Sequence, residues 1–363
     1  MFEHEIMTAG ELLDKQLPSK PIVVEGMLPT GTYILAGTPK IGKSFFATQL
    51  CWSVAEGVPF LGMPTRKSTV LYMTLEDTRE RLQARLVRMF GTDWAGDDLH
   101  LLFQVEQRGE ALIPQLHDFV FDHPETRLIV IDTLQRIRED TGTSFSYKCD
   151  YETITPLKTF SDAHDVALIV VHHTRKQTED ENPFNQISGT NGLLGAADGA
   201  FLLHREKNEV FLEQSVRDMP GQRYVLSFNR ERCIWELVRK ELDTIQEPPE
   251  PVLEVIAQIV GDGCWAGTAT ELMRLVKEIE PTLENKPNAL TRRLNTLTAR
   301  LEREYGILYR NHRSSKRRGI TFSQKMMDDS NDANDDIAPA GEEPSLPSLA
   351  SLASQEGGEI DAV

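Results

Sequence analysis

Residues 37–44 read Gly-Thr-Pro-Lys-Ile-Gly-Lys-Ser, which fits the pattern G-x-x-x-x-G-K-[ST] of a phosphate-binding P-loop. The apolar residues 33–36 before it predict a short buried strand, and the breaker-free residues 45–55 after it predict a helix packed on a sheet. A turn of this kind at a helix N-terminus points backbone N–H groups at an anion. The alternative, a chance glycine-rich turn, does not explain the strand and the helix. We therefore expect this chain to bind a nucleoside triphosphate.

The P-loop residues have separate expected roles. Gly37 and Gly42 permit the backbone angles of the anion nest, Lys43 would reach the β- and γ-phosphates, and the Ser44 hydroxyl would ligate Mg²⁺. The residues expected to contact the nucleotide are Gly37, Thr38, Pro39, Lys40, Ile41, Gly42, Lys43, Ser44 and Phe45.

A second pattern supplies the other half of a magnesium site. Residues 128–131, Leu-Ile-Val-Ile, predict a buried strand that ends in Asp132, which is the Walker B form. Many buried strands end in Asp, but this one follows a P-loop in the expected order. Asp132 would hold Mg²⁺ through water, so ATP and Mg²⁺ are the expected ligands.

The carboxylate that activates water has to come from elsewhere, because Thr133 follows Asp132. Glu76 comes directly after the strand predicted over residues 69–75, which we expect beside the P-loop strand, so Glu76 can face the γ-phosphate. The alternative is a helix-capping acid like Asp77. A hydrolase needs a positioned base, which favours the catalytic role for Glu76.

Two histidines follow the apolar strand predicted over residues 166–171. Alternation along a strand places His172 and His173 on opposite sides, so one of them can face the nucleotide. A polar side chain there could touch the γ-phosphate and relay its loss to the next loop. The alternative is a hydrogen-bonded structural histidine, but ligands collect at this edge of an α/β sheet.

The rest of the sequence predicts the fold class and the division of the chain into units. Strands and helices alternate up to about residue 200, which predicts an α/β fold with a parallel sheet, and close-spaced strands from residue 201 predict an antiparallel extension. The proline-rich stretch 247–251 is the best boundary. The predicted units are an N-terminal helix and linker (1–28), a P-loop ATPase domain (29–243), three helices and a hairpin in a winged-helix pattern (252–323) and a disordered acidic tail (326–363).

The composition of the chain limits where the protein can be located and which partners it can bind. No apolar run reaches 18 residues and the N-terminus lacks signal-peptide features, so we expect a soluble cytoplasmic protein without a membrane partner. The four cysteines form no C-x-x-C pair, which predicts reduced thiols. The net charge is −17, but ten acids lie in residues 326–363, which hold no Lys or Arg. The whole-chain charge therefore does not exclude a DNA partner.

The C-terminal part is basic. Residues 286–318 hold ten Lys or Arg and two acids. A recognition helix with Arg292, Arg293 and Arg300, next to a basic wing, would make a footprint for duplex DNA. The alternative is that the charge run is only a solvated face.

Taken together, these motifs carry a resemblance. The P-loop, the strand-end Glu, the hydrophobic-Asp-Thr-Leu segment and Val-His-His-Thr-Arg-Lys follow one another as in the RecA-like ATPases of the RepA type. Those are hexameric helicases of plasmids and mobile elements, related to DnaB-type replicative helicases. The resemblance covers about residues 20–240 and continues through Ile-Ser-Gly-Thr-Asn-Gly at 187–192 and Ala-Ala-Asp at 196–198.

The resemblance implies a RecA-like fold, a homo-oligomeric ring and active sites between subunits. It puts His173 in the sensor position and Arg217 in the position of an arginine finger; the alternative for Arg217 is a surface arginine at a strand end. Loops at about 138–150 and 177–190 would face single-stranded DNA, but they are poorly basic here.

The function that the resemblance implies is an ATP-hydrolysing DNA motor, a replicative helicase of a plasmid, phage or integrated element. Two alternatives stay open: an ATP-dependent DNA-binding regulator or assembly switch, and an accessory ATPase of recombination.

Overall fold

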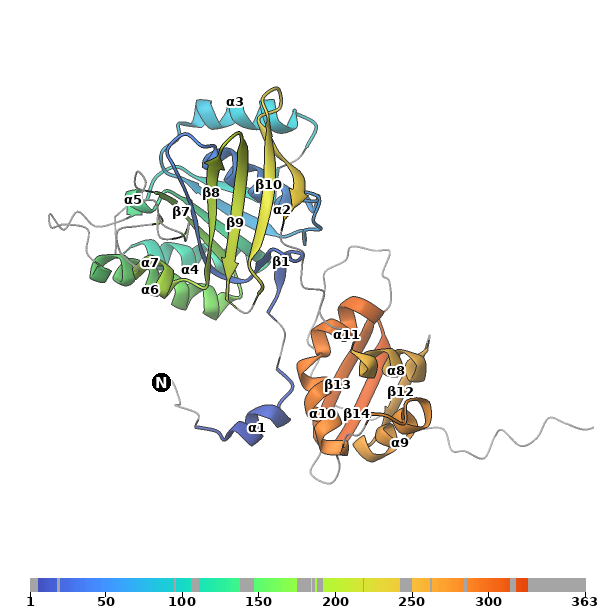
Figure 1. Ribbon diagram of the computed structural model, residues 1–363. Coiled ribbons are helices and arrows are strands. Elements are labelled where there is room, and N and C mark those ends of the chain that lie inside the picture. Colours follow the sequence, from blue (N-terminus) through green and yellow to red (C-terminus); the bar gives the residue numbers. More distant parts are fainter. Residues whose placement is uncertain are drawn as a thin grey trace, which may run out of the picture.

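A computed structural model of the chain describes residues 6–17, 20–94, 96–105, 111–137, 147–174, 184, 187, 192–217, 219–241, 250–261, 263–283, 286–313 and 318–325. They form a large α/β unit and a smaller unit built from the C-terminal part, as Figure 1 shows. The tail predicted over residues 326–363 and the basic turn at residues 314–317 lie outside the described residues.

The large unit is built on a nine-stranded sheet with the order β11-β10-β9-β8-β3-β7-β6-β4-β5. Its strands are β3 (Gly31–Gly37), β4 (Thr69–Thr74), β5 (Leu99–Leu102), β6 (Thr126–Asp132), β7 (Ala167–His173), β8 (Gly199–Glu206), β9 (Glu209–Val216), β10 (Gln222–Asn229) and β11 (Ile234–Lys240). Strands β3 to β8 pair in parallel and β9 to β11 pair antiparallel. The predicted α/β sheet with an antiparallel extension is confirmed, except that β8 still runs parallel to β3.

One expected neighbour relation is wrong. Strand β4, which precedes Glu76, does not lie beside the P-loop strand β3, because β7 and β6 lie between them. Glu76 instead follows the strand that pairs with the Asp132 strand, with Thr74 opposite Asp132. Chain order alone does not reveal this, since the helical crossovers can place later strands between earlier ones.

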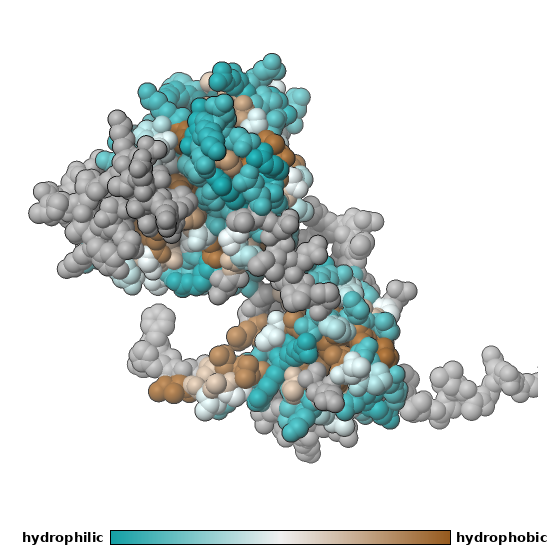
Figure 2. Space-filling model, viewed as in Figure 1, coloured by the Kyte–Doolittle hydropathy of each residue, from teal (hydrophilic) through white to brown (hydrophobic). Residues whose placement is uncertain are grey.

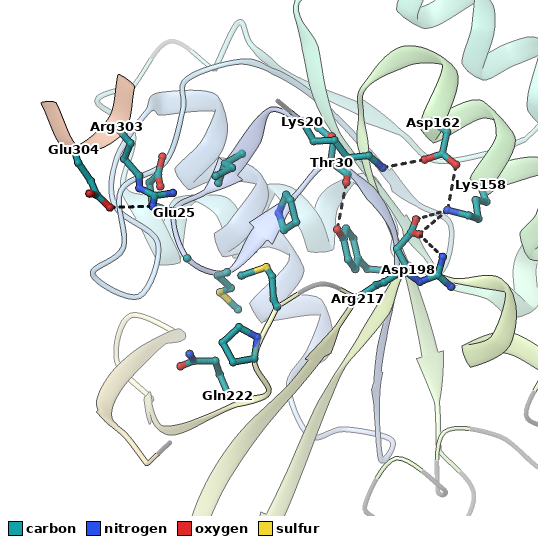
Figure 3. Close-up of a pocket in the computed structure, with 17 residues that line it drawn as sticks. Lys20, Glu25, Thr30, Lys158, Asp162, Asp198, Arg217, Gln222, Arg303 and Glu304 are labelled. Carbon is teal, nitrogen blue, oxygen red and sulfur yellow. Dashed lines mark hydrogen bonds and ion pairs between the residues drawn. The ribbon is translucent and has the colours of Figure 1, made fainter. Parts of the chain in front are cut away.

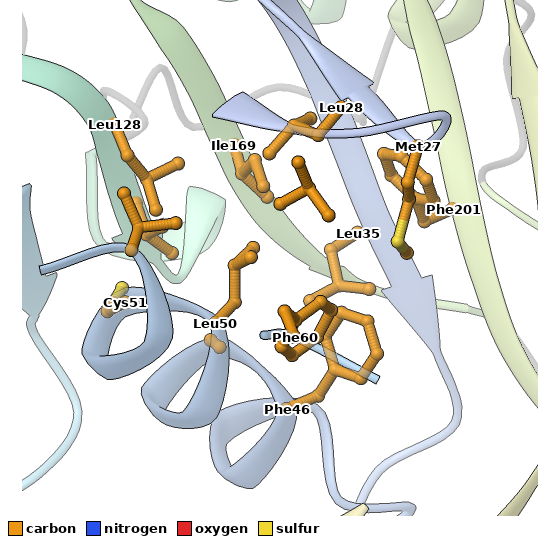
Figure 4. Packing of buried hydrophobic residues seen from close by; sticks show 14 of the residues in the cluster. Met27, Leu28, Leu35, Phe46, Leu50, Cys51, Phe60, Leu128, Ile169 and Phe201 are labelled. Atoms are coloured by element: carbon orange, nitrogen blue, oxygen red, sulfur yellow. The ribbon is translucent and has the colours of Figure 1, made fainter. Parts of the chain in front are cut away.

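Helices cover both faces of the sheet: α2 (Lys43–Glu56), α3 (Arg79–Phe90), α4 (Leu112–Asp122), α5 (Leu134–Ile137), α6 (Tyr147–His164) and α7 (Gly192–Ala196). Neighbouring side chains of a strand point to opposite faces, so Leu35 joins one buried cluster and Ile34 the other. Figure 4 shows Phe46 and Leu50 of α2 packing on the Leu35 face. The short strands β1 (Ile22–Val24) and β2 (Leu28–Pro29) add buried side chains to the same cluster.

The smaller unit has its own core. Its elements are α8 (Pro251–Val260), β12 (Cys264–Gly267), α9 (Ala269–Ile279), α10 (Pro287–Thr296), α11 (Thr298–Tyr305), β13 (Ile307–Arg313) and β14 (Arg318–Gln324). The three strands form an antiparallel sheet with the order β12-β14-β13. The third helix predicted there is divided into α10 and α11, and β12 is an additional strand. A separate buried cluster, with Leu253, Leu272 and Leu290 among its members, holds the unit together.

The N-terminal helix α1 (Ala9–Asp14) begins at the predicted capping box, in which Thr8 and Glu11 bond to each other's backbone N–H. It packs on the smaller unit, where Asp14 pairs with Arg292 at 2.8 Å. In the described part of the chain, no helix is both long and apolar enough to cross a bilayer.

We predict that the chain cut after Glu247 keeps a folded, nucleotide-binding α/β unit, because the described members of its two clusters lie between Val23 and Leu237. An ATP analogue with Mg²⁺ at 100 times its Kd should stabilise this fragment by about 2.7 kcal/mol, which corresponds to about 5–10 °C in Tm. Thermal unfolding with and without the ligand measures this. Aggregation would show that the smaller unit is needed for the fold, and a Tm unchanged by the ligand would show that the folded fragment does not bind the nucleotide.

Candidate nucleotide site

The P-loop lies between β3 and α2, and its backbone is shaped by contacts from distant strands. Gly42 caps α2 in a left-handed conformation, with φ of 109°. A Cβ atom at Gly42 would lie 2.7 Å from the Trp235 ring, and one at Gly37 would lie 2.5 Å from the Leu203 carbonyl oxygen. Both positions therefore require glycine. The contacts from β8 and β11 were not predicted from the sequence.

Lys43 is folded back on its own loop. Its side chain is buried, and Nζ donates to the carbonyl oxygens of Gly37 at 2.7 Å and Thr38 at 3.0 Å. Burial lowers the pKa of the ammonium group to about 8, although the charges of Asp132 and Glu76 oppose this. A triphosphate would replace the carbonyls with oxygens of full negative charge, which Lys43 would bind more strongly.

His173 lies against Lys43, with Nδ1 3.0 Å from Nζ. Burial and the nearby ammonium group lower the pKa of His173, so the ring is neutral near pH 7. Since Lys43 has only protons to offer, Nδ1 accepts and the ring proton is assigned to Nε2. The structure thus brings the predicted sensor histidine next to the predicted phosphate-binding lysine.

Asp132 is buried at the end of β6 and accepts a hydrogen bond from the Tyr72 hydroxyl at 3.1 Å. Burial raises its pKa, although hydrogen bonds from Ser44 and Tyr72 oppose this. Ser44 and Asp132 therefore offer a hydroxyl and a carboxylate oxygen side by side. Such hard oxygen ligands fit Mg²⁺, which keeps waters and phosphate oxygens as its other ligands. Tyr72 was not predicted to take part.

Glu76 lies at the rim of the same site, where its side chain is 44% exposed. The Thr133 hydroxyl donates to its Oε1 at 2.9 Å, and the Arg136 Nε atom lies 3.9 Å from it. The carboxylate is thus oriented by the residue that directly follows Asp132. This arrangement suits a base that holds a water molecule at the γ-phosphate.

Arg85 forms a further wall. The Arg85 side chain, on α3, is only 11% exposed and pairs with Asp77 at 2.7 Å. Its guanidinium group also lies 5.0 Å from the Phe45 ring centre. Asp77 is not the helix cap, since Thr78 caps α3.

Together these residues enclose a cavity of about 430 Å³. Its lining includes Pro39, Lys40, Gly42, Lys43, Ser44, Phe45, Glu76, Asp77, Arg85, Asp132, Thr133 and His173. Side chains from the start of α2 and from the ends of β4, β6 and β7 thus converge on one space. They offer cations that could bind phosphate, oxygens that could bind Mg²⁺ and a carboxylate that could hold water.

Arg217 lies elsewhere. It follows β9, whose last residues pair with the start of β8. The start of β8 lies beside the first half of β3, so Arg217 is at the opposite end of the strands from the P-loop. Its side chain is 60% exposed and approaches Asp198 at 3.8 Å. Figure 3 shows it with Lys158 in a larger cavity of about 1110 Å³. Arg217 does not line its own chain's nucleotide cavity, so its role in a neighbouring subunit stays a prediction.

The loops expected to face DNA lie mostly outside the described residues.

Comparison of the sequence with protein-family models finds one match. Residues 3–179 match the family model AAA_25, described as an AAA domain. The matched segment includes Lys43, Glu76, Asp132 and His173, and it ends before Arg217 and the smaller unit. A search of curated proteins found no match.

Three solved structures are similar at low identity. One, titled as an ATPase domain, is 17% identical with a TM-score of 0.48, over 58% of this chain and 85% of that one. A DnaB-like replicative helicase, in a structure titled for its interactions with primase, is 17% identical with a TM-score of 0.47, over 57% of each chain. A KaiC-like protein from Pyrococcus horikoshii OT3 is 16% identical with a TM-score of 0.45, over 62% of this chain and 99% of that one.

The lowered pKa of Lys43 predicts proton uptake on nucleotide binding. At pH 8.5, with a pKa of about 8, Lys43 is largely neutral in the free site, and phosphate oxygens would raise its pKa. Binding of an ATP analogue with Mg²⁺ should take up about three quarters of a proton at pH 8.5 and almost none at pH 6.5. Calorimetry in buffers of different ionisation enthalpy measures this. Lys43→Arg is the control, because arginine stays charged; equal uptake by this variant would contradict the assignment.

Proposed function

We propose that this chain is a P-loop ATPase that drives a DNA motor as a ring of several copies, of the RecA-like helicase class. The observation that carries the proposal is the convergence of Lys43, Asp132, Glu76 and His173 on one cavity from the start of α2 and three strand ends. The AAA domain match over residues 3–179 supports the ATPase part.

In the proposed reaction, water attacks the γ-phosphate in line with the leaving β-phosphate oxygen. Lys43 leaves its loop carbonyls and binds the β- and γ-phosphates. Ser44 and Asp132 would hold Mg²⁺, which would neutralise part of the phosphate charge when bound. Glu76, oriented by Thr133, holds the attacking water and accepts its proton. His173, beside Lys43, is placed to respond to loss of the γ-phosphate.

The DNA part of the proposal rests on the resemblance to plasmid and mobile-element helicases and on the smaller unit. The order of its elements, two helices around β12 followed by α10, α11 and a hairpin, fits a winged helix. Such a unit would present α10 to duplex DNA. The alternative function, a DNA-binding assembly switch, is distinguished by which DNA stimulates ATP turnover: single-stranded DNA for the motor and a specific duplex for the switch.

The predicted duplex footprint needs one correction. Arg292, Arg293 and Arg300 were expected to offer their charges to DNA. Each is paired with an acid instead: Arg292 with Asp14 at 2.8 Å, Arg293 with Glu250, and Arg300 with Glu304 at 2.7 Å. Asp14 and Glu250 lie outside the basic run and were not counted with it, because their pairing in space is not visible in the sequence. Glu304 is one of the two acids counted within the run, four residues after Arg300.

Glu76→Gln tests the proposed chemistry. The amide cannot accept the proton of water, so turnover of ATP should fall roughly 10²–10⁴-fold while the affinity for an ATP analogue stays the same. Glu80→Gln is the matched control, since Glu80 lies one turn away on α3 and does not line the cavity. Steady-state hydrolysis and analogue titration measure the two effects. Normal turnover by Glu76→Gln would remove Glu76 from the base role.

Arg217 tests the ring. Arg217→Ala should bind ATP normally, since the P-loop belongs to the same chain, and hydrolyse it roughly 10³–10⁵-fold more slowly, as loss of an arginine finger does. Lys43→Ala should be inactive because it lacks the phosphate-binding charge. An equimolar mixture should regain activity, because some interfaces join an intact Lys43 to an intact Arg217. No recovery in mixtures shown to co-assemble would contradict the shared site.

A further inference from the structure

Helix α1 is held against α10 by polar contacts. The Asp14 carboxylate accepts from Arg292 Nε at 2.8 Å, and the Asn295 side chain donates to the Leu13 carbonyl at 3.2 Å. Asn295 is itself buried and accepts a hydrogen bond from the Tyr309 hydroxyl. The first contact therefore pairs a carboxylate with the charge of Arg292, and the second bonds α1 to a buried side chain of the smaller unit.

The segment after α1 continues along β13. The Gln16 side chain donates to the Tyr309 carbonyl at 2.7 Å and accepts from the Asn311 backbone N–H at 2.9 Å. Strand β13 is at the edge of its sheet. The Gln16 amide thus makes the pair of hydrogen bonds that a further strand would make, and it covers part of this edge.

The contact is nevertheless shallow. No residue of α1 is buried, and Leu12 and Leu13 are each 46% exposed. Figure 2 shows apolar side chains on the outside of this segment. Six residues are too few for a helix that is stable alone in water. Helix α1 therefore depends on a few polar contacts, and their loss would release it at little cost to either core.

The surface beneath α1 is the one that a nucleic acid would use. Helix α10 carries Arg292 and Arg293 within the basic run of residues 286–318. The Asp14 carboxylate meets Arg292 as a phosphate oxygen would, since both are anionic hydrogen-bond acceptors. Helix α1 also carries Glu11 in its first turn, which adds a second negative charge next to a positive face.

We propose that α1 is a displaceable cover of the DNA-binding face of the smaller unit, and that duplex phosphates compete with Asp14 for Arg292. The inference rests on the proposed duplex binding by this unit. In this proposal the N-terminal segment controls the DNA-binding face. When α1 is docked, the positive charge of the face is partly neutralised, and when α1 is released, the face is accessible to DNA.

The test uses the full chain with Asp14→Ala and Gln16→Ala together, which removes side-chain contacts of the α1 segment and leaves α10 unchanged. Loss of these few polar contacts should release α1, so duplex binding should become about tenfold tighter. Glu278→Ala is the matched control: it removes an acid paired with Arg274 on α9 and leaves α1 in place. Its affinity should change less than twofold. Binding is measured by fluorescence anisotropy with a labelled duplex at fixed low salt.

Hydrogen exchange of the unaltered chain gives an independent readout. Added duplex should speed exchange at the backbone amides of residues 12–14 and slow it on α10. Arg292→Ala in the released variant should lose the gain in affinity, since the competing cation is then absent.

Three outcomes overturn the inference. Equal duplex affinity of the unaltered chain and the double variant, without faster exchange in α1, rejects the cover and leaves duplex binding standing. An equal gain from Glu278→Ala shows that only the overall charge matters. Absence of duplex binding by all variants rejects the proposed duplex binding and the cover with it.

Discussion

A buried ammonium group is the constraint on which the large unit depends. Lys43 is taken out of water and held by carbonyl oxygens of its own loop, and burial lowers its pKa to about 8. Such a cation is tolerated only where anionic groups lie close. Strands β6 and β4, which lie second and third from β3 in the sheet, provide them, because β6 ends in Asp132 and β4 leads to Glu76. The order of the strands thus places carboxylates close enough to stabilise the buried charge of Lys43, which stays available to bind phosphate.

The antiparallel extension belongs to the same site, although it is distant in the sequence. Trp235 of β11 donates from its indole N–H to the Gly42 carbonyl at 3.2 Å, and its ring fills the space beside Gly42. Gln49 of α2 bonds to both the N–H and the carbonyl of Trp235. The helix that starts at the P-loop is therefore fastened to the far strand, which holds the loop in shape before any ligand arrives.

Much of the nucleotide site could be predicted, because the P-loop and the strand ending in Asp132 are local patterns. The apolar strand predicted that one of His172 and His173 faces the site, and the family resemblance pointed to His173, which lies 3.0 Å from Lys43. The strand order could not be predicted, since it depends on the path of the crossovers. Nor could Tyr72, Arg85 or Trp235, because their partners are far away in the chain. The partner of α1 was missed for the same reason: a capping box marks where a helix begins and says nothing about what it packs on.

The docking of α1 gives the α/β unit an attachment at each end of its chain. One attachment runs from Gln16 to β1, and the other runs from β11 to α8. A unit held by one tether can swivel in every direction, whereas a unit held by two turns mainly about the line that joins them. Docking of α1 therefore joins the two units at two places instead of one. Undocking would remove one of the two attachments and free the N-terminal end of the α/β unit.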